Sequence, residues 1–257
     1  MLDSTMKIAI YRIFIKTLIV VAAIIGIKYL FHFLHWEIIL LGSLHSSAIS
    51  GVIFVIGFIL SSTLSDYKEA ERIPAEIASA IEDMHEDVVS IHSGYPKVNL
   101  KQYQEQLRKV ASAFAGDLRN SSSNKAKTQL FKLGQLHADM EKAGVPANFI
   151  VKLKQQQAML VRHLFRVNYI QRITFIPSAT ILAWSIVLLT IALLVFTEIE
   201  PFFGGMILTG VITFILMYVL QLIHVIRTPF HGEGSTRDDV SLFLIERTID
   251  HLKIKRS

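Results

Sequence analysis

Residues 47–82 read SAISGVIFVIGFILSSTLSDYKEAERIPAEIASAIE, a stretch that begins apolar and becomes charged without a break. Its apolar half predicts a membrane-crossing helix, which takes about 20 residues. At helical spacing, one face of that helix is small and polar at both ends and aromatic in the middle. This face holds Ser47, Ser50, Gly51, Phe54, Phe58, Ser61 and Ser65. We interpret it as the lining of a pore, with the constriction at Phe54 and Phe58.

The composition is that of a membrane protein. Of the 257 residues, 52% are hydrophobic and only 18% are charged, which is too apolar for an ordinary soluble domain. The absence of cysteine excludes disulfides, thiolate metal sites and cysteine nucleophiles. Although the net charge is +5, the basic residues alternate with acidic ones, so we expect no nucleic-acid partner.

Four apolar runs predict four membrane spans, at about residues 8–33, 47–64, 174–196 and 202–226. The polar region between the second and third runs has helical periodicity, as in the stripe Leu100, Tyr103, Leu107, Val110 and Phe114. The predicted fold class is an all-α membrane protein with four transmembrane helices and a cytosolic helical layer. The segments are 1–64 with the pore helix 47–64, the cytosolic region 65–172, the second helix pair 173–226, and the cytosolic C-terminal segment 227–257.

Local signals mark helix boundaries in the polar region. Pro74 lacks a backbone donor and is expected to kink or interrupt the helix that continues from the second span. The run NSSSN at 120–124 predicts a loop with a helix N-cap. Gly144 followed by Pro146 predicts that one helix ends and the next begins.

The distribution of basic residues predicts the orientation. Lys and Arg are absent from residues 29–67 and 173–226, so the positive-inside rule places both termini and the central helices in the cytoplasm, in a plasma (inner) membrane. Two short outer loops remain, and their titratable side chains are His32, His35, Glu37 and His45 in one and Glu198 and Glu200 in the other. Lys28 falls near the outer end of the first span, where we expect it to extend to the interface.

A pore requires several copies of such a chain, because four spans enclose little space. In a symmetric ring each residue of the exposed face becomes a ring of side chains. Rings of Phe54 and Phe58 would form a poorly hydrated neck that gates by dewetting. The alternative is ordinary helix packing, with Ser50, Gly51 and Gly57 allowing close helix contact.

Two short motifs carry a family resemblance. The segment FVIGF at 54–58 is followed by a Ser/Thr-rich stretch, DYK at 66–68 and ER at 71–72. The segment PFHGE at 229–233 directly follows the fourth span and precedes acidic residues and a helix. The order of two spans, helical layer, two spans and this second motif resembles the bestrophins over nearly the whole chain. The paired tryptophans of the family are absent, and Arg227-Thr228 stands where an acidic residue usually precedes Pro-Phe.

The resemblance implies a homopentameric ion channel and no enzyme. The positions that match the family's neck are Ser50, Phe54 and Phe58, and the same helix would line the pore through Ser47, Gly51, Ser61 and Ser65. Animal relatives conduct chloride under calcium control and some bacterial ones conduct cations; we expect chloride or other anions in preference to monovalent cations. The self-assembled chain, the lipid bilayer and small inorganic ions are the expected partners.

The family's calcium clasp is diluted in this sequence. The corresponding acids would be Glu233, Asp238 and Asp239, which Gly, Ser and Arg residues separate. Because calcium takes six to eight oxygen ligands, we expect a weak cation site at most, no tight calcium site and no cofactor. The alternative for these acids is a solvated turn with a helix N-cap.

Two other functions compete with the channel. The outer-loop histidines and Glu37 offer ligands for zinc or copper, but their spacing fits no tight motif, so we expect interfacial side chains without a bound metal. The other alternative is a non-conducting membrane scaffold or sensor that docks partners through its cytosolic helices.

Overall fold

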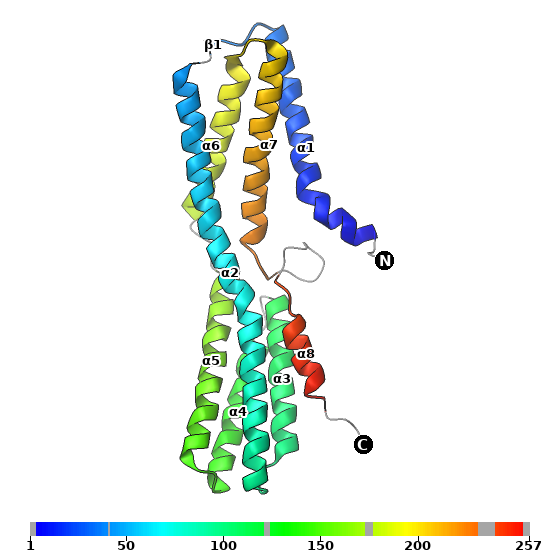
Figure 1. Cartoon of the computed structure of the whole chain (residues 1–257), viewed down its shortest axis with the longest axis vertical. Coiled ribbons are helices and arrows are strands. Elements are labelled where there is room, and N and C mark those ends of the chain that lie inside the picture. The colour runs from blue at the N-terminus through cyan, green and yellow to red at the C-terminus, as the bar shows by residue number, and fades with distance from the viewer. Residues whose placement is uncertain (1–3, 41, 121–123, 173–176, 231–239, 254–257) are drawn as a thin grey trace. The chain divides into compact units, whose positions relative to one another are not determined.

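A computed structural model describes residues 4–40, 42–120, 124–172, 177–230 and 240–253, and these are almost entirely helical (Figure 1). The helices are α1 (Ser4–Phe33), α2 (Ser43–Gly94), α3 (Leu100–Arg119), α4 (Lys125–Lys142), α5 (Ala147–Arg172), α6 (Pro177–Phe196), α7 (Phe202–Ile226) and α8 (Phe243–His251). Two short strands, β1 (Ile39–Leu40) and β2 (Thr197–Glu198), pair in parallel.

The chain divides into two compact units. Among the described residues, the first unit comprises 4–67 and 177–227, and the second comprises 68–172, 228–230 and 240–253. Helix α2 contributes its first half to one unit and its second half to the other. We call the first the membrane unit, because it holds the apolar part of each span, and the second the polar unit.

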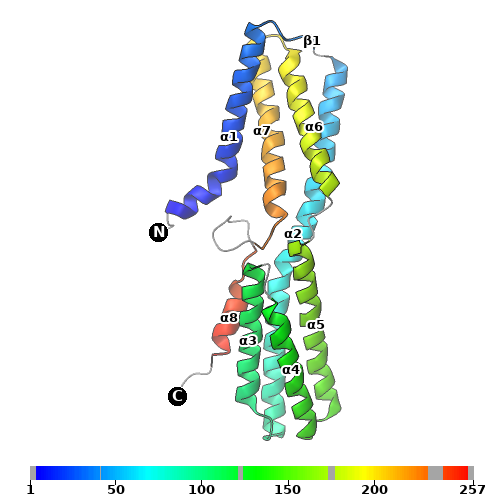
Figure 2. The ribbon, with the colours of Figure 1, turned by 180° about the vertical axis from the view of Figure 1, so that it is seen from behind.

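The membrane unit confirms the four predicted spans. Four helices are long and apolar enough to cross a bilayer, over Ile13–Phe33 of α1, His45–Gly94 of α2, Ser178–Phe196 of α6 and Phe202–Ile226 of α7. Helix α7 contacts both α1 and α6 (Figure 2). A side chain at Gly210 would lie 3.0 Å from Ile25 Cδ1, so this glycine lets α7 approach α1 closely.

Helix α2 does not end at Pro74, as we had considered; it runs without interruption from Ser43 to Gly94. The apolar stripe continues on both sides of the proline, and every member is buried: Ile73, Ile77, Ile81, Met84, Val88 and Ile91. Burial of this stripe stabilises the helix enough to offset one lost backbone hydrogen bond, so Pro74 does not interrupt it.

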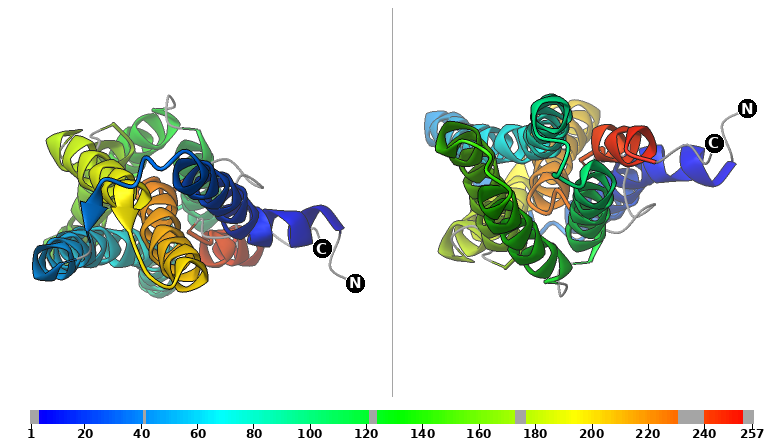
Figure 3. Two further views of the ribbon diagram at one scale, coloured as in Figure 1. Left: turned by 90° about the horizontal axis from the view of Figure 1, so that it is seen from above. Right: turned by 90° about the horizontal axis from the view of Figure 1, so that it is seen from below.

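In the polar unit α3 packs on α4 and α4 packs on α5, as the view from below shows (Figure 3). The second half of α2 belongs to the same unit and is joined to α5 by the ion pair of Asp87 with Lys152, at 2.6 Å. Four of the five residues of the predicted stripe on α3 are buried, Tyr103, Leu107, Val110 and Phe114, whereas Leu100 at the start of the helix is only partly buried. On α4 and α5 the buried apolar side chains are Ala126, Leu130, Leu133, Met140, Ile150, Leu153, Leu160, Leu164 and Val167. The helical layer is therefore held by the faces that helical spacing predicts.

The turns between these helices use different capping devices. Asn99 accepts a hydrogen bond from Gln102 N at 3.0 Å and so caps α3. Asn124 makes no side-chain cap for α4; Asp117 of α3 replaces it and accepts from Ala126 N at 2.9 Å. The predicted stop at 144–146 is confirmed, with Gly144 at φ 87° between α4 and α5.

A buried polar pair joins α3 to α4. Burial, followed by the charge of Asp87, raises the pKa of Tyr103 well above its ordinary value, so its hydroxyl stays protonated. This hydroxyl is hydrogen-bonded to Nε2 of His137 at 2.8 Å. Burial lowers the pKa of His137 to about 4, and the positive charge of Lys154 acts in the same direction. His137 is therefore neutral in the folded protein at neutral pH.

We predict that this histidine makes the protein less stable in acid. Its unfolded pKa is about 6.5, above the folded value, so the unfolded chain binds more protons between these limits. The free energy of unfolding should fall by up to about 3 kcal/mol as the pH drops from 6.5 to 4. Thermal unfolding of the full chain at a series of pH values measures this. In His137→Gln the decline should be shallower; equal slopes in both proteins would contradict the assignment.

Candidate functional site

The apolar half of α2 buries one side within the membrane unit. Ile56 is 3% exposed and Ile59 is 6% exposed, and Thr63 donates its hydroxyl to the carbonyl of Ile59 at 2.8 Å. Two of these α2 residues belong to one core cluster with α6 and α7, whose members are Ile56, Ile59, Ala183, Val187, Ile191, Val195, Leu216, Leu220 and Ile223. This contact fixes the rotation of α2 about its axis.

The opposite side of α2 has no cover in the protomer. Phe54 is 75% exposed and Phe58 is 72% exposed. The other residues of the predicted face are exposed as well: Ser47, Ser50, Gly51, Ser61 and Ser65. All residues of the predicted face are therefore exposed in the described protomer.

This exposure decides against one alternative. If Phe54 and Phe58 were ordinary packing residues of one subunit, their rings would lie against α6 or α7 as Ile56 does. Gly57 likewise has no atom of the described protomer within 4 Å of the position of an added Cβ, so it serves no close helix contact there. The face is free to meet water, lipid or another copy of the chain.

A buried ion pair lies where α1 meets the outer connection. Lys28 is 1% exposed; its Nζ lies 2.5 Å from Glu37 Oε1 and donates to the carbonyl of Thr197 in β2. His32 Nδ1 lies 2.6 Å from the other carboxylate oxygen of Glu37. Lys28 therefore turns inward, which corrects the expectation that it extends to the interface. A lysine in hydrocarbon needs such partners, because an unpaired buried charge is costly.

A cleft of about 540 Å³ opens beside this ion pair. It is lined by His32, Glu37, Glu198, Ile199, Glu200, Pro201 and Phe202, and the ring of His32 stacks on Phe202 at 3.8 Å. Burial opposes ionisation of Glu37, but its hydrogen bonds and charge interactions with Lys28 and His32 are stronger, so its pKa lies below the ordinary value. The cleft thus presents carboxylates from the connection that follows α1 and from the connection between α6 and α7.

The outer-loop histidines do not converge. His45 accepts from Gly42 N at 3.2 Å, away from the pair formed by His32 and Glu37. Among the described residues, no group of three metal-ligating side chains includes His32, His35, Glu37 or His45. The metal alternative at this loop gains no geometric support.

The weak cation site predicted at Glu233, Asp238 and Asp239 lies outside the described residues. The chain on either side of it is described: Pro229 and Phe230 are buried, and Val240 N donates to the Pro229 carbonyl at 2.9 Å. The two described residues Pro229 and Val240, which flank this part of the chain, are therefore joined by a backbone hydrogen bond.

Sequence comparisons find nothing: no family model and no curated protein matches the chain. Solved structures do match. A bacterial Bestrophin homologue from Klebsiella pneumoniae, crystallised with a point mutation, is 14% identical and has a TM-score of 0.80 over 93% of this chain and 97% of its own. A second mutant of that homologue gives 0.78 at 14% identity, over 93% of this chain and 97% of its own. A structure described as a membrane protein variant gives 0.81 at 14% identity, over 93% and 96%.

The fold first defines a class, an integral membrane protein with four apolar helices and a polar helical unit. Within that class, the superposition over nearly the full length of both chains shows that the protein has a bestrophin-like fold, as the sequence motifs predicted.

We predict that truncating side chains on the two sides of α2 costs very different amounts of stability. Phe54→Ala should change the free energy of unfolding by less than about 1 kcal/mol, because the ring contacts little of its own subunit. Ile56→Ala should cost about 2–5 kcal/mol, because it leaves a cavity in the core cluster. Thermal unfolding of the detergent-purified proteins compares them. Equal losses from both variants would contradict the exposed position of Phe54.

We also predict that Lys28→Met is strongly destabilising. It leaves the Glu37 carboxylate, 7% exposed, without its main partner, and breaking a buried pair costs about 3–5 kcal/mol. The double variant Lys28→Met/Glu37→Leu should recover part of this loss, because no buried charge then remains unpaired. Thermal unfolding followed by circular dichroism measures both. A single variant as stable as the unchanged protein would show that the pair is not buried.

Proposed function

We propose that the protein is a homopentameric channel for small inorganic ions, with a neck formed by Ser50, Phe54 and Phe58. The supporting observation is the uncovered face of α2, on a helix whose other side is fixed by the core cluster. A ring of copies would place this face around a common axis, where it is solvated or self-contacting instead of exposed to lipid. The bestrophin-like fold supports the same assembly.

The chemistry of the face supports ion passage through a dewetting neck. Rings of Ser47, Ser61 and Ser65 would offer hydroxyls to a hydrated ion on either side of the phenylalanines. At the neck, an ion loses part of its water shell to an apolar wall, which is the main barrier. The face carries no charged side chain, so dehydration cost would decide selectivity. We propose that chloride and other anions pass in preference to monovalent cations, as the bestrophin-like fold suggests. Among the anions, the larger ones hold water more weakly and should pass the neck more readily.

The placement in the cell follows from the basic residues. We propose that the chain resides in the inner membrane with both termini and the polar unit in the cytoplasm, because the outer connections lack Lys and Arg. No cofactor is needed for conduction in this proposal, and Glu233, Asp238 and Asp239 hold calcium weakly at most.

The first test is ion flux from liposomes that contain the purified protein, which shows whether ions pass. The second is the reversal potential of the protein in a planar bilayer under a KCl gradient, which we expect near the chloride equilibrium value. Phe54→Ala and Phe58→Ala should each raise single-channel conductance several-fold, because they widen the apolar neck. Phe203→Ala on α7 is the matched control, since that ring is equally exposed and lies off the proposed neck; it should leave conductance unchanged.

The outcomes separate the parts of the proposal. A reversal potential at the potassium value would overturn the anion preference and keep the channel. No flux from the unchanged protein would favour the scaffold alternative, for which Phe131 and Phe165 of the polar unit, both exposed, offer docking surface. Single-particle images that show any number of subunits other than five would overturn the pentamer. Loss of assembly in both phenylalanine variants would indicate that these rings pack between subunits.

A further inference from the structure

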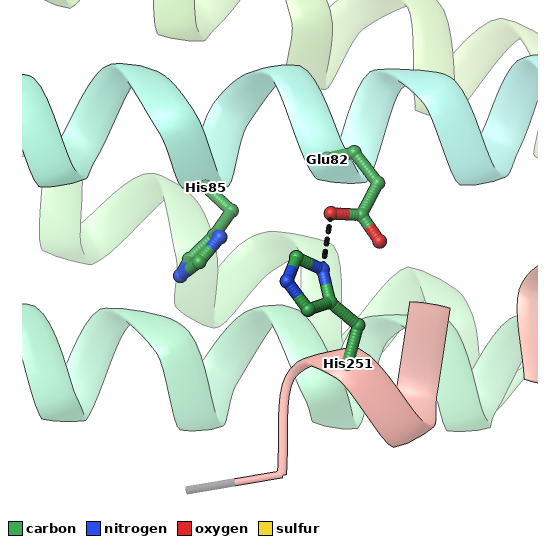
Figure 4. Close-up of side chains that lie close together, drawn as sticks. All are labelled: Glu82, His85 and His251. Carbon is green, nitrogen blue, oxygen red and sulfur yellow. Dashed lines mark hydrogen bonds and ion pairs between the residues drawn. The ribbon is translucent and has the colours of Figure 1, made fainter. Parts of the chain in front are cut away.

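Three potential metal ligands meet in the polar unit, away from the proposed neck residues in sequence. Glu82 and His85 lie on α2, and His251 lies at the end of α8. One ligand atom of each side chain comes within 4.8 Å of the others (Figure 4). Among the described residues, no other group of three or more His, Asp or Glu side chains brings its ligand atoms this close together.

The fold explains why these side chains meet. Glu82 and His85 are three residues apart on one helix, so both project from the same face. Helix α8 packs on α3 within the same unit and carries His251 to that face. His251 Nδ1 lies 2.8 Å from Glu82 Oε2, and the two imidazole rings lie 5.7 Å apart at 84°. Figure 4 shows the Glu82 carboxylate and the His251 imidazole turned toward each other, with the His85 imidazole beside them.

The donor set has the chemistry of a zinc site. Two imidazoles and one carboxylate, with a fourth position left to water, is a set that Zn²⁺ takes in proteins. Tetrahedral zinc places its ligand atoms about 3.3 Å from one another, so small side-chain rotations bring this group to the required spacing. The carboxylate and His251 are partly exposed, which leaves access for an ion and for the fourth, water ligand.

We propose that Glu82, His85 and His251 bind a divalent transition-metal ion of the zinc type, which fastens α8 to α2. A plain ion pair between Glu82 and His251 would explain their contact, but it does not account for a second imidazole at the same point. The pair His163–Glu76 shows the simpler arrangement in the same unit: their atoms lie 3.4 Å apart, and no third ligand joins them in the described structure.

The test uses the full chain in detergent, with any affinity tag removed and metal stripped by a chelator. Titration calorimetry with ZnCl₂ should show one site per chain with a dissociation constant of about micromolar or tighter. His85→Ala and His251→Ala should each weaken binding at least about tenfold. His163→Ala and His35→Ala are matched controls, because they remove histidines outside the group, and both should bind as the unchanged protein does.

A second readout guards against a folding defect in the variants. Co²⁺ bound by this set should give visible absorption bands, and Glu82→Gln should change their position or intensity while leaving circular dichroism unaltered. Zn²⁺ should also raise the unfolding temperature of the unchanged protein and not that of His251→Ala. The proposal is overturned if the unchanged protein does not bind zinc. It is also overturned if His85→Ala and His251→Ala both bind zinc as tightly as the unchanged protein does. None of these measurements depends on ion conduction, so they succeed or fail apart from the proposed channel.

Discussion

The packing of one side of α2 against α6 and α7 is the constraint on which the membrane unit depends. Ile56 and Ile59 enter a core made by residues of those two helices, and this sets which side of α2 remains uncovered. Because side chains on a helix are fixed about 100° apart, burying Ile56 also fixes the direction of Phe54 and Phe58. The core therefore determines which face of α2 is uncovered. The positions of the side chains on that face are only as well defined as the packing of the core.

The same helix serves a different purpose further along. Beyond Tyr67 it belongs to the polar unit, where a stripe from Ile73 to Ile91 is buried among helices that are otherwise charged. Hydrophobic burial, and not helix propensity, keeps α2 continuous through Pro74. A single continuous helix therefore belongs to both the membrane unit and the polar unit, with no loop between its two halves.

The sequence predicted what is periodic and missed what depends on distant partners. The spans, the stripe on α3 and the stop at Gly144 follow from apolar spacing and turn chemistry, and all three are present. The exposure of Phe54 and Phe58 agrees with the predicted face, although their place at a pore neck stays a prediction. The parallel pairing of β1 with β2 had no local signal, because each strand has two residues.

Single charged residues were the other weak point. A lysine in an apolar run gave warning, but whether Lys28 reaches water or Glu37 depends on how the outer connection folds back. The spacing of Glu82 and His85 was visible, whereas His251 lies 169 residues beyond Glu82 and nothing local joins them. Asp117 capping α4 from α3 is a third contact of this kind, and it replaced the expected cap at Asn124.

The hydrogen bond between Val240 N and the Pro229 carbonyl has a consequence for how such chains can diverge. Because both partners are main-chain atoms, substitutions at these two positions leave the bond in place, except for a proline at position 240, which has no N–H to donate. The start of the terminal helix can therefore keep its place while the side chains around it change.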